Sequence, residues 1–193
     1  GNQTRTRILH EAAVLFNQHG YAATSFTDIM SATGLGKGGV FNHFANKDVL
    51  ALAAFDYAFA VARDYFVQAV TAKPTALEQL LAVVEVFKDF SQDTPLPGGC
   101  PLLNTAIESD DAYPELRERT KDGMTQWHSL IARLVRRGIA QGEIWANVNP
   151  HQTATVMIAT LEGAVMLTKL YGDLTYMEQV IEHLTGYVQG LKA

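Results

Sequence analysis

The chain has 193 residues, 48% of them hydrophobic and 18% charged, which is enough apolar material for a folded core and too little charge for a disordered protein. Its single cysteine excludes an internal disulfide and a cysteine-rich metal site, and is typical of the reducing cytoplasm. A formal net charge of −5 argues against nucleic acid as a partner unless basic residues gather on one face.

Apolar residues recur at spacings of three and four along almost the whole chain, and no sustained alternating run is bounded by hairpin turns. We therefore expect an all-α protein of about nine helices. The predicted helices are one that ends at residue 19, then 28–33, 37–44, 47–72, 75–91, a short one after residue 101, 114–141, 150–171 and 174–191. Thr27 and Asn46 are predicted to cap the second and fourth helices.

The first fifty residues contain four helix starts, whereas the helices that follow are longer. This predicts a small domain at residues 1–48 and a larger helical domain at residues 49–193. The first twenty residues follow an amphipathic pattern, so no signal peptide is expected. The most apolar stretch, residues 156–167, is shorter than the about 20 residues that a bilayer requires, so we expect a cytoplasmic protein with no membrane span.

Residues 26–44 have the parts of a helix-turn-helix: a short first helix, a glycine turn that lets two helices cross steeply, and a short second helix. Val40 and Phe44 are expected to bury one side of the second helix. The residues left on its outer side are Lys37, Gly38, Gly39, Asn42 and His43. In this motif the second helix enters the major groove of DNA with its N-terminal residues toward the base edges.

The outward residues have chemistry that suits DNA. Asn42 can read adenine through its amide, and Lys37 can meet guanine or a phosphate. Gly38 and Gly39 would let the backbone approach the duplex closely. The sequence therefore predicts a base-reading surface on the second helix of the motif.

Two further residues are placed to hold phosphates. Thr27 and Lys47 lie at helix N-termini, where backbone N–H groups also face the DNA backbone. The distribution of charge permits this contact, because residues 1–50 have four basic side chains against three acidic ones, a net of +1, whereas residues 51–193 carry a net of −6. The acidic body would then lie away from the phosphates.

This part of the chain resembles the N-terminal signature of the TetR family of transcriptional repressors, with four short motifs in the right order and spacing. The motifs are FNQHGY at 16–21, TSFTDI at 24–29, GLGKGGVFNHF at 34–44 and NKDVL at 46–50. The resemblance implies a repressor whose residues 1–48 bind double-stranded operator DNA. The residues that match DNA-contacting positions of the family are Thr27, Lys37, Gly39, Phe41, Asn42, His43 and Lys47.

Two positions depart from the commonest form of the signature. Gly36 stands where Ser or Thr often caps the recognition helix, and Phe41 stands where Tyr often gives its hydroxyl to a phosphate. Each change would weaken a contact without removing the fold. Whether Phe41 packs in the core or contacts the DNA backbone stays open.

The segment GCPLLN at 99–104, with Glu108 after it, resembles the corresponding segment of the LmrA- and YxaF-type branch of the family. That resemblance implies a regulator that binds a small lipophilic effector among its middle helices and then releases DNA. Aromatic side chains with a few polar groups are the natural lining of such a pocket. The residues expected to line it are Phe59, Phe66, Phe87, Phe90, Cys100, Asn104, Trp127 and Ile131.

These side chains also have simpler interpretations. Phenylalanines at helical spacing are more often plain core, and Cys100 is more simply an inert cysteine than a redox sensor. His128, His151 and His183 lack the clustered spacing of a metal site and are most simply surface or capping residues. No metal and no cofactor are expected.

The last two helices carry the prediction of a homodimer. Residues 156–170 are apolar around most of the helix, more than one neighbouring helix would bury. Ala159 and Gly163 would let a helix of a second chain approach closely, and residues 174–191 offer a parallel stripe. Two recognition helices about 35 Å apart would then match one turn of B-DNA, which implies a palindromic operator. The alternative is that this helix is only the buried centre of its own domain.

Two other functions are compatible with parts of the sequence. An enzyme could use Cys100 as nucleophile with His128 or His183 as base, but nothing in their spacing places them together, and no phosphate loop, metal motif or Ser-His-Asp arrangement appears. No catalytic residue is therefore expected. A helical ligand-binding protein without DNA binding is the other alternative, and the acidic charge with the departures at Gly36 and Phe41 favours it.

Overall fold

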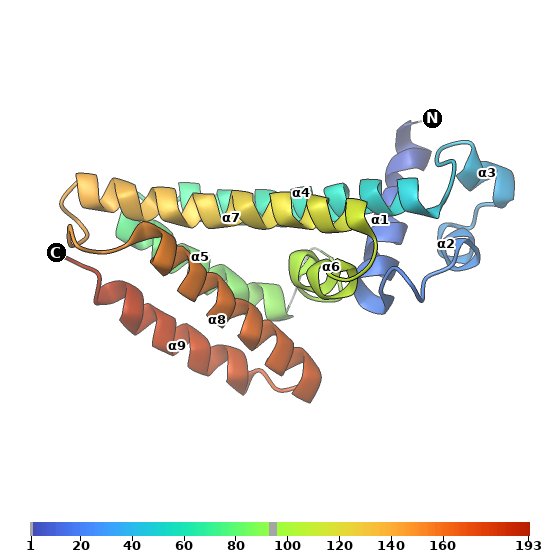
Figure 1. The fold of residues 1–193 in the computed structure, drawn as a ribbon. Coiled ribbons are helices and arrows are strands. Elements are labelled where there is room, and N and C mark those ends of the chain that lie inside the picture. The colour runs from blue at the N-terminus through green and yellow to red at the C-terminus, as the bar shows by residue number, and fades with distance from the viewer. Residues whose placement is uncertain (1, 93–95) are drawn as a thin grey trace. The chain divides into compact units, whose positions relative to one another are not determined.

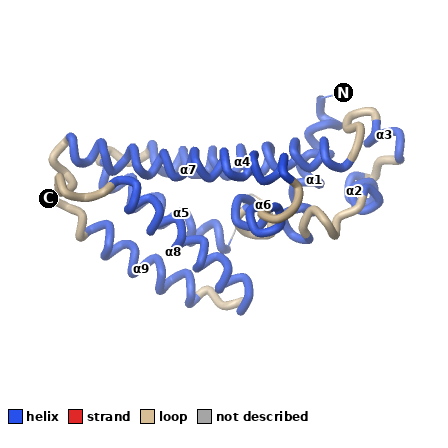
Figure 2. Tube along the Cα trace, in the orientation of Figure 1, coloured by secondary structure: helices blue, strands red, loops and turns tan. Residues whose placement is uncertain are grey.

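The computed structural model describes residues 2–92 and 96–193, and of residues 89–92 only the backbone. The described residues form helices joined by loops, with no strand among them (Figure 1 and Figure 2), which confirms the all-α prediction. The helices are α1 (Asn2–His19), α2 (Phe26–Thr33), α3 (Lys37–Phe41), α4 (Lys47–Thr71), α5 (Ala76–Gln92), α6 (Pro101–Ser109), α7 (Pro114–Ala140), α8 (Pro150–Tyr171) and α9 (Thr175–Gln189).

Helix boundaries agree best with the prediction where neighbouring residues in the sequence cap the helix. Asn149 accepts the N–H groups of His151 and Gln152 at 3.0 and 3.1 Å, and Pro150 occupies the first helical position, so α8 spans the predicted residues. Helix α3 is shorter than predicted, because it ends at Phe41 and not at residue 44. After that residue the chain tightens, and the His43 N–H donates to the Val40 carbonyl at 3.0 Å.

One compact unit of the chain comprises residues 1–62 and 95–123, and so contains α1, α2, α3, α6 and the first parts of α4 and α7. Helix α1 packs against α2 and α6. The core of this unit is made of side chains from α1, α2, α3 and α4, from the loop between α3 and α4, and from the loop that precedes α6. Its well-buried members include Ile8, Ala12, Ile29, Val40, Phe44, Leu50, Ala54 and Leu96. Helix α3 is therefore held to this core by its Val40.

A second compact unit comprises residues 63–94 and 124–193. Here α5, α8 and α9 pack against one another. The core of this unit includes Leu80, Val83, Phe87, Ile131, Met157, Leu161, Met177 and Leu184. Helices α4 and α7 each begin in the first unit and end in the second, so the chain is continuously helical where it passes from residue 62 to 63 and from residue 123 to 124.

Helix α8 is long and apolar enough to cross a membrane by length and composition. The expectation that no segment reaches this length was based on residues 156–167, whereas the helix extends over Pro150–Tyr171. The same property is found in buried core helices, and α8 packs against α5 and α9. Part of its apolar surface remains uncovered in the single chain, since Met166 is 48% and Leu170 71% exposed.

Candidate DNA-binding surface and effector-binding cluster

Helix α2 is capped at both ends, and its C-terminal cap forms the turn to α3. At its start the Ser25 hydroxyl accepts the Asp28 N–H at 3.2 Å, and the Asp28 carboxylate accepts the Ser25 N–H at 2.7 Å. At its end Gly34 has φ 64°, a left-handed conformation that glycine adopts without a Cβ clash. The chain can therefore reverse within a few residues and begin α3 at Lys37.

Thr27 does not cap α2, and this corrects the prediction. Ser25 is the cap, and Thr27 lies inside the helix with its side chain exposed. The sequence does contain the signal, because Ser25 with an acidic residue three positions later is a capping-box pattern. The Ser25 hydroxyl also donates to the Asp28 carboxylate at 2.7 Å, and this bond together with the one from the Ser25 N–H holds the pKa of Asp28 below its ordinary value.

Helix α3 presents its polar side outward, as the sequence predicts. Val40 has no exposed surface, while Lys37, Gly38 and Asn42 are exposed. Gly39 and His43 are partly buried. A Cβ at Gly39 would lie 3.3 Å from that of Leu35, so this residue also lets the turn pack closely against the helix. The outer surface of α3 is thus made of the residues expected to read DNA.

Phe41 has features of both roles left open for it, packing against the protein and exposure toward the DNA backbone. Its ring stacks on Phe26, with ring centroids 4.7 Å apart and planes 11° from parallel, yet it remains 39% exposed. The Lys37 ammonium lies 5.6 Å from the centre of the same ring. Phe41 therefore supports the Lys37 side chain and keeps one edge toward solvent.

Lys47 contacts the loop between α1 and α2. Its ammonium lies 4.3 Å from the centre of the Tyr21 ring and donates to the Ala22 carbonyl at 3.4 Å. The Tyr21 hydroxyl donates to the Asp48 carboxylate. Burial and this hydrogen bond raise the pKa of the Tyr21 hydroxyl well above its ordinary value, so it stays protonated as a donor. The N-terminus of α4 is thereby joined to the loop ahead of α2.

Arg5 is one of the four basic residues in 1–50, and no sequence pattern predicts it at the site. Its guanidinium lies 5.1 Å from the centre of the Phe44 ring, just beyond α3. The charge therefore lies beside the proposed DNA-reading surface, although Arg5 is far from α3 in sequence. Only the packing of α1 against the helix-turn-helix brings the two together, so no local pattern could have shown it.

Three of the residues predicted to contact an effector form one aromatic cluster in the second unit. Phe87 stacks on Trp127 at a centroid distance of 5.4 Å, and Phe66 lies 5.2 Å from Phe87 and 5.9 Å from Trp127. Ile131 is fully buried one helical turn after Trp127. The side chain of Phe90 lies outside the described residues.

The other three predicted effector residues belong to the first unit. Phe59 stacks with Phe55 at a centroid distance of 6.3 Å, and Cys100 is buried at the start of α6. The Asn104 amide donates to the backbone carbonyl and to Oδ1 of Asn17, at 3.1 and 2.8 Å, and to the Gly98 carbonyl at 2.9 Å. Asn104 therefore has a structural role that its sequence neighbourhood did not indicate.

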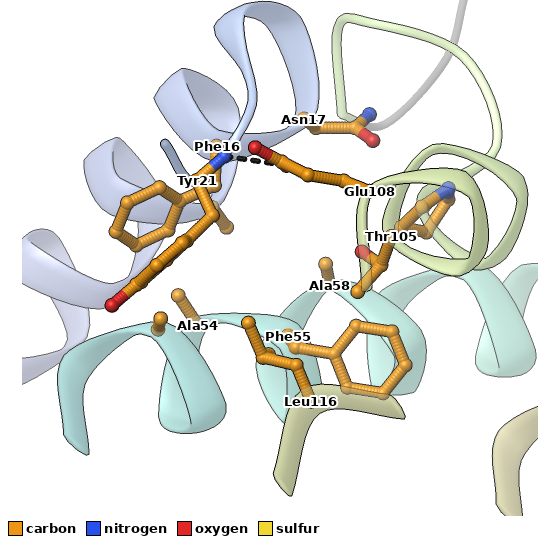
Figure 3. Close-up of a pocket in the computed structure, with 12 residues that line it drawn as sticks. Phe16, Asn17, Tyr21, Ala54, Phe55, Ala58, Thr105, Glu108 and Leu116 are labelled. Atoms are coloured by element: carbon orange, nitrogen blue, oxygen red, sulfur yellow. Dashed lines mark hydrogen bonds between the residues drawn. The ribbon is translucent and has the colours of Figure 1, made fainter. Parts of the chain in front are cut away.

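A small cavity lies in the first unit, lined by residues of α1, α4, α6 and α7 (Figure 3). Its volume is about 30 Å³, which is room for a water molecule or two and far less than a drug-sized ligand fills. The residues that line it include Asn17, Thr105 and Glu108 together with apolar residues such as Phe55 and Leu116. This cavity lies between helices of the first unit, and none of the predicted effector residues lines it.

Two histidines of the second unit, His128 and His151, contact neighbouring side chains, whereas His183 is exposed. The Arg136 guanidinium lies 2.8 Å from Nε2 of His151, and the ring of His151 stacks on that of His128. His128 also lies 3.1 Å from the Thr155 hydroxyl. Among the residues that the structure describes, no group of three potential ligands is arranged to hold a metal ion.

Comparison with known proteins identifies both parts of the chain. A family described as bacterial regulatory proteins, tetR family, matches residues 8–54, and one described as tetracyclin repressor-like, C-terminal domain, matches residues 76–184. The crystal structure of a TetR transcriptional regulator from Chloroflexus aurantiacus is 45% identical, covers 97% of this chain and 95% of its own, and superposes with a TM-score of 0.94.

Two curated relatives from Bacillus subtilis support the predicted branch. YxaF, an uncharacterized HTH-type transcriptional regulator, is 26% identical over 94% of this chain and 93% of its own length. LmrA, an HTH-type transcriptional regulator, is 25% identical over 86% of each chain. All of these matches are to transcriptional regulators, a class of proteins that are not enzymes. The chain is a member of the TetR family of helix-turn-helix transcriptional regulators, with a DNA-binding N-terminal part and a ligand-binding helical C-terminal part.

Proposed function

We propose that this protein is a cytoplasmic, homodimeric repressor that binds a palindromic operator through the outer face of α3 and leaves it when a small lipophilic effector binds. One observation carries the proposal: α3 buries Val40 while Lys37 and Asn42 are exposed. A short helix that is anchored on one side and polar on the other can enter the major groove without unfolding. Residues 1–48 would act as the DNA-binding domain and residues 49–193 as the effector-binding and dimerisation domain.

Each outward residue has a proposed role at the operator. Asn42 and Lys37 contact base edges, and Gly38 and Gly39 allow the backbone to approach them. The remaining residues contact the phosphates and sugars on either side, and these are Thr27, Phe41, His43 and Lys47. The ring of Phe41 is held by Phe26, so its exposed edge is already in place before DNA binds.

The effector site proposed here is the cluster of Phe66, Phe87 and Trp127, with Ile131 beside it. The Trp127 indole N–H is buried and has no hydrogen-bond acceptor among the described residues. A buried donor without an acceptor costs free energy, so a ligand that offers an acceptor would be favoured. We therefore expect a flat apolar effector that carries at least one hydrogen-bond acceptor. Phe59, Phe90 and Cys100 are further candidates, whereas the amide of Asn104 is already used within the protein.

The proposed dimer uses α8 and α9. On α8, Val156, Met166 and Leu170 are 40%, 48% and 71% exposed in the single chain. A Cβ at Gly163 would meet no atom within 4 Å, so a second helix has room to approach there. Pairing these helices about a twofold axis would bury the exposed apolar side chains and give two recognition helices related by the symmetry of a palindrome.

Release of DNA would follow from the continuity of α4. This helix begins beside the helix-turn-helix at Lys47 and contains Phe66 of the proposed effector cluster. An effector that separates the three aromatic rings would displace the end of α4 that contributes Phe66. The two recognition helices would then no longer match successive major grooves.

The test begins with a duplex that the wild-type protein selects from a randomised pool. Binding should weaken steeply with salt, because each dimer neutralises several phosphates. Asn42→Ala should lower affinity by about tenfold or more, since a bidentate base contact contributes about 1–3 kcal/mol. Lys37→Ala should also weaken binding, and both variants should keep the wild-type melting temperature and sedimentation behaviour.

A matched control separates a local contact from a change in net charge. Lys88→Ala removes the same charge from an exposed position in the second unit and should leave operator affinity nearly unchanged. If wild-type protein selects no duplex at low salt, or if Lys37→Ala and Lys88→Ala behave alike, the DNA-reading role of α3 is wrong. A loss of dimer in either α3 variant would contradict the assignment of domains.

A further inference from the structure

A carboxylate from α6 binds the loop that joins α1 to α2. Oε2 of Glu108 accepts the backbone N–H of Tyr21 at 2.6 Å, and Oε1 accepts that of Ala22 at 2.7 Å. Figure 3 shows the Glu108 side chain reaching from α6 toward Tyr21. The two donors are consecutive, so one carboxylate fixes the direction of the backbone between α1 and α2. Hydrogen bonds to an ionised acceptor are about twice as strong as neutral ones.

We propose that Glu108 is a positioning residue for operator binding, because its carboxylate sets the loop from which the helix-turn-helix begins. This inference rests on the proposed DNA-binding role of α3. Glu108 itself does not contact DNA in the proposed role. It acts through the backbone of Tyr21 and Ala22, which leads directly into the cap of α2 at Ser25.

The loop held by Glu108 is also joined to the start of α4. The Tyr21 hydroxyl donates to Asp48, and the Lys47 ammonium contacts both the Tyr21 ring and the Ala22 carbonyl. The loop is thus held by α6 through its N–H groups and by α4 through its side chain and carbonyl. A shift of the Glu108 carboxylate would therefore move the loop that joins α1 to α2 and that also contacts the start of α4.

A second tie keeps α6 in register with α1. The Asn104 amide, one helical turn before Glu108, donates to the carbonyl and side chain of Asn17 near the end of α1. Asn17 in turn donates to the carbonyls of Pro97 and Gly99. Gly98 has φ 112°, and a Cβ there would lie 2.7 Å from the Asn17 carbonyl oxygen, so only glycine fits between these contacts.

The two ties give a structural role to Asn104 and Glu108 of the segment GCPLLN at 99–104 and the residues after it. Asn104 and Glu108 are four residues apart and so lie on one face of α6. This face contacts the end of α1 through Asn104 and the loop after α1 through Glu108. In the chain α6 lies between α5 and α7, and both of those helices contribute to the proposed effector cluster. Movement of α6 along its axis would therefore disturb the contacts of the Glu108 carboxylate and of the Asn104 amide together.

The experiment measures operator affinity and backbone protection in the full-length protein. The variants are Glu108→Gln, which keeps the shape and removes the charge, and Glu108→Ala, which removes both oxygens. Glu115→Gln, at an exposed position in the same unit, is the control for the loss of one negative charge. The DNA probe is the duplex selected by the wild-type protein, and hydrogen exchange reports on the amides of Tyr21 and Ala22.

The sign of the change distinguishes positioning from simple electrostatics. Removal of an acidic group would strengthen DNA binding if only the long-range field mattered, and Glu115→Gln should show this or no effect. Glu108→Gln should instead weaken binding, and Glu108→Ala should weaken it by about tenfold or more, as expected for two lost charge-assisted hydrogen bonds. The salt dependence should keep its slope, because no phosphate contact is removed, and the two amides should exchange about tenfold faster.

Two results would overturn the proposal. One is a Glu108→Ala protein that binds the operator as tightly as wild type or more tightly, and the other is unchanged exchange of the Tyr21 and Ala22 amides in both variants. If Glu108→Ala does not fold, Glu108→Gln still decides the question, because it preserves the packing. Failure of the wild-type protein to bind any duplex would instead refute the proposed function, and is distinguishable because it does not depend on the variants.

Discussion

Replacement of Asn17 by alanine should detach the segment ahead of α6 from α1. Asn17 is 7% exposed, and its amide donates to the carbonyls of Pro97 and Gly99, both at 2.9 Å. Its Oδ1 accepts from Asn104 at 2.8 Å. The variant loses all three hydrogen bonds and keeps the helical backbone, since alanine is the residue that α-helices favour most.

The expected loss of stability depends on which former partners of Asn17 can form another hydrogen bond. Pro97 is exposed, so water can bind its carbonyl, and Asn104 keeps the carbonyls of Asn17 and Gly98 as acceptors. The Gly99 carbonyl is partly buried and has the poorest access to water. A lost hydrogen bond lowers stability by about 1 kcal/mol, by less where water replaces the partner and by more where a buried group is left without one. We therefore expect the variant to lose about 2–3 kcal/mol of unfolding free energy. For a chain of this length that corresponds to a decrease of about 4–12 °C in melting temperature.

Urea denaturation measures this loss of stability. The protein concentration is kept the same for all variants, because dimerisation contributes to apparent stability. Gln18→Ala, at the next and exposed position of α1, is the control and should change stability by no more than about 0.5 kcal/mol. Asn104→Ala combined with Asn17→Ala should cost less than the sum of the two single changes, because both remove the same bond. Equal effects of Asn17→Ala and Gln18→Ala, or strict additivity with Asn104→Ala, would refute the reasoning.

Three other predictions concern the DNA surface, the cap and the dimer. Phe41→Tyr adds a hydroxyl to an exposed, stacked ring and should raise operator affinity several-fold in an anisotropy titration; weaker binding would mean that the ring edge faces no phosphate. The bonds from Ser25 hold the pKa of Asp28 below its ordinary 3.8, so its contribution to stability is complete above pH 3.8 and is lost as the pH falls through the lower folded-state value. Wild type should therefore melt above Asp28→Asn at neutral pH, with the difference vanishing in acid, and a difference independent of pH would contradict this. Leu170→Glu should give monomers in sedimentation and weak operator binding, whereas an intact dimer would place the interface elsewhere.

The helices and most of their ends can be predicted from the sequence because their causes are local. A proline after an asparagine cap begins α8, and the spacing of apolar residues along α3 indicates which side is buried. The outward position of Lys37 and Asn42 follows from the same spacing. The one misplaced cap, Thr27 in place of Ser25, arose because both hydroxyl residues precede the helix pattern and only one of them has its partner three residues later.

The residues that connect the elements could not be predicted, because their partners lie far apart in the sequence. Glu108 binds N–H groups 86 and 87 residues earlier, and Arg5 meets Phe44 only through the packing of α1. The contacts among the rings of Phe66, Phe87 and Trp127 likewise require three helices to converge. Local patterns decide which residues form helices and which side each helix buries, since those depend on bonds within one turn. Which polar groups meet across helices depends on the packed fold, where a few ångströms decide whether a carboxylate reaches its donors.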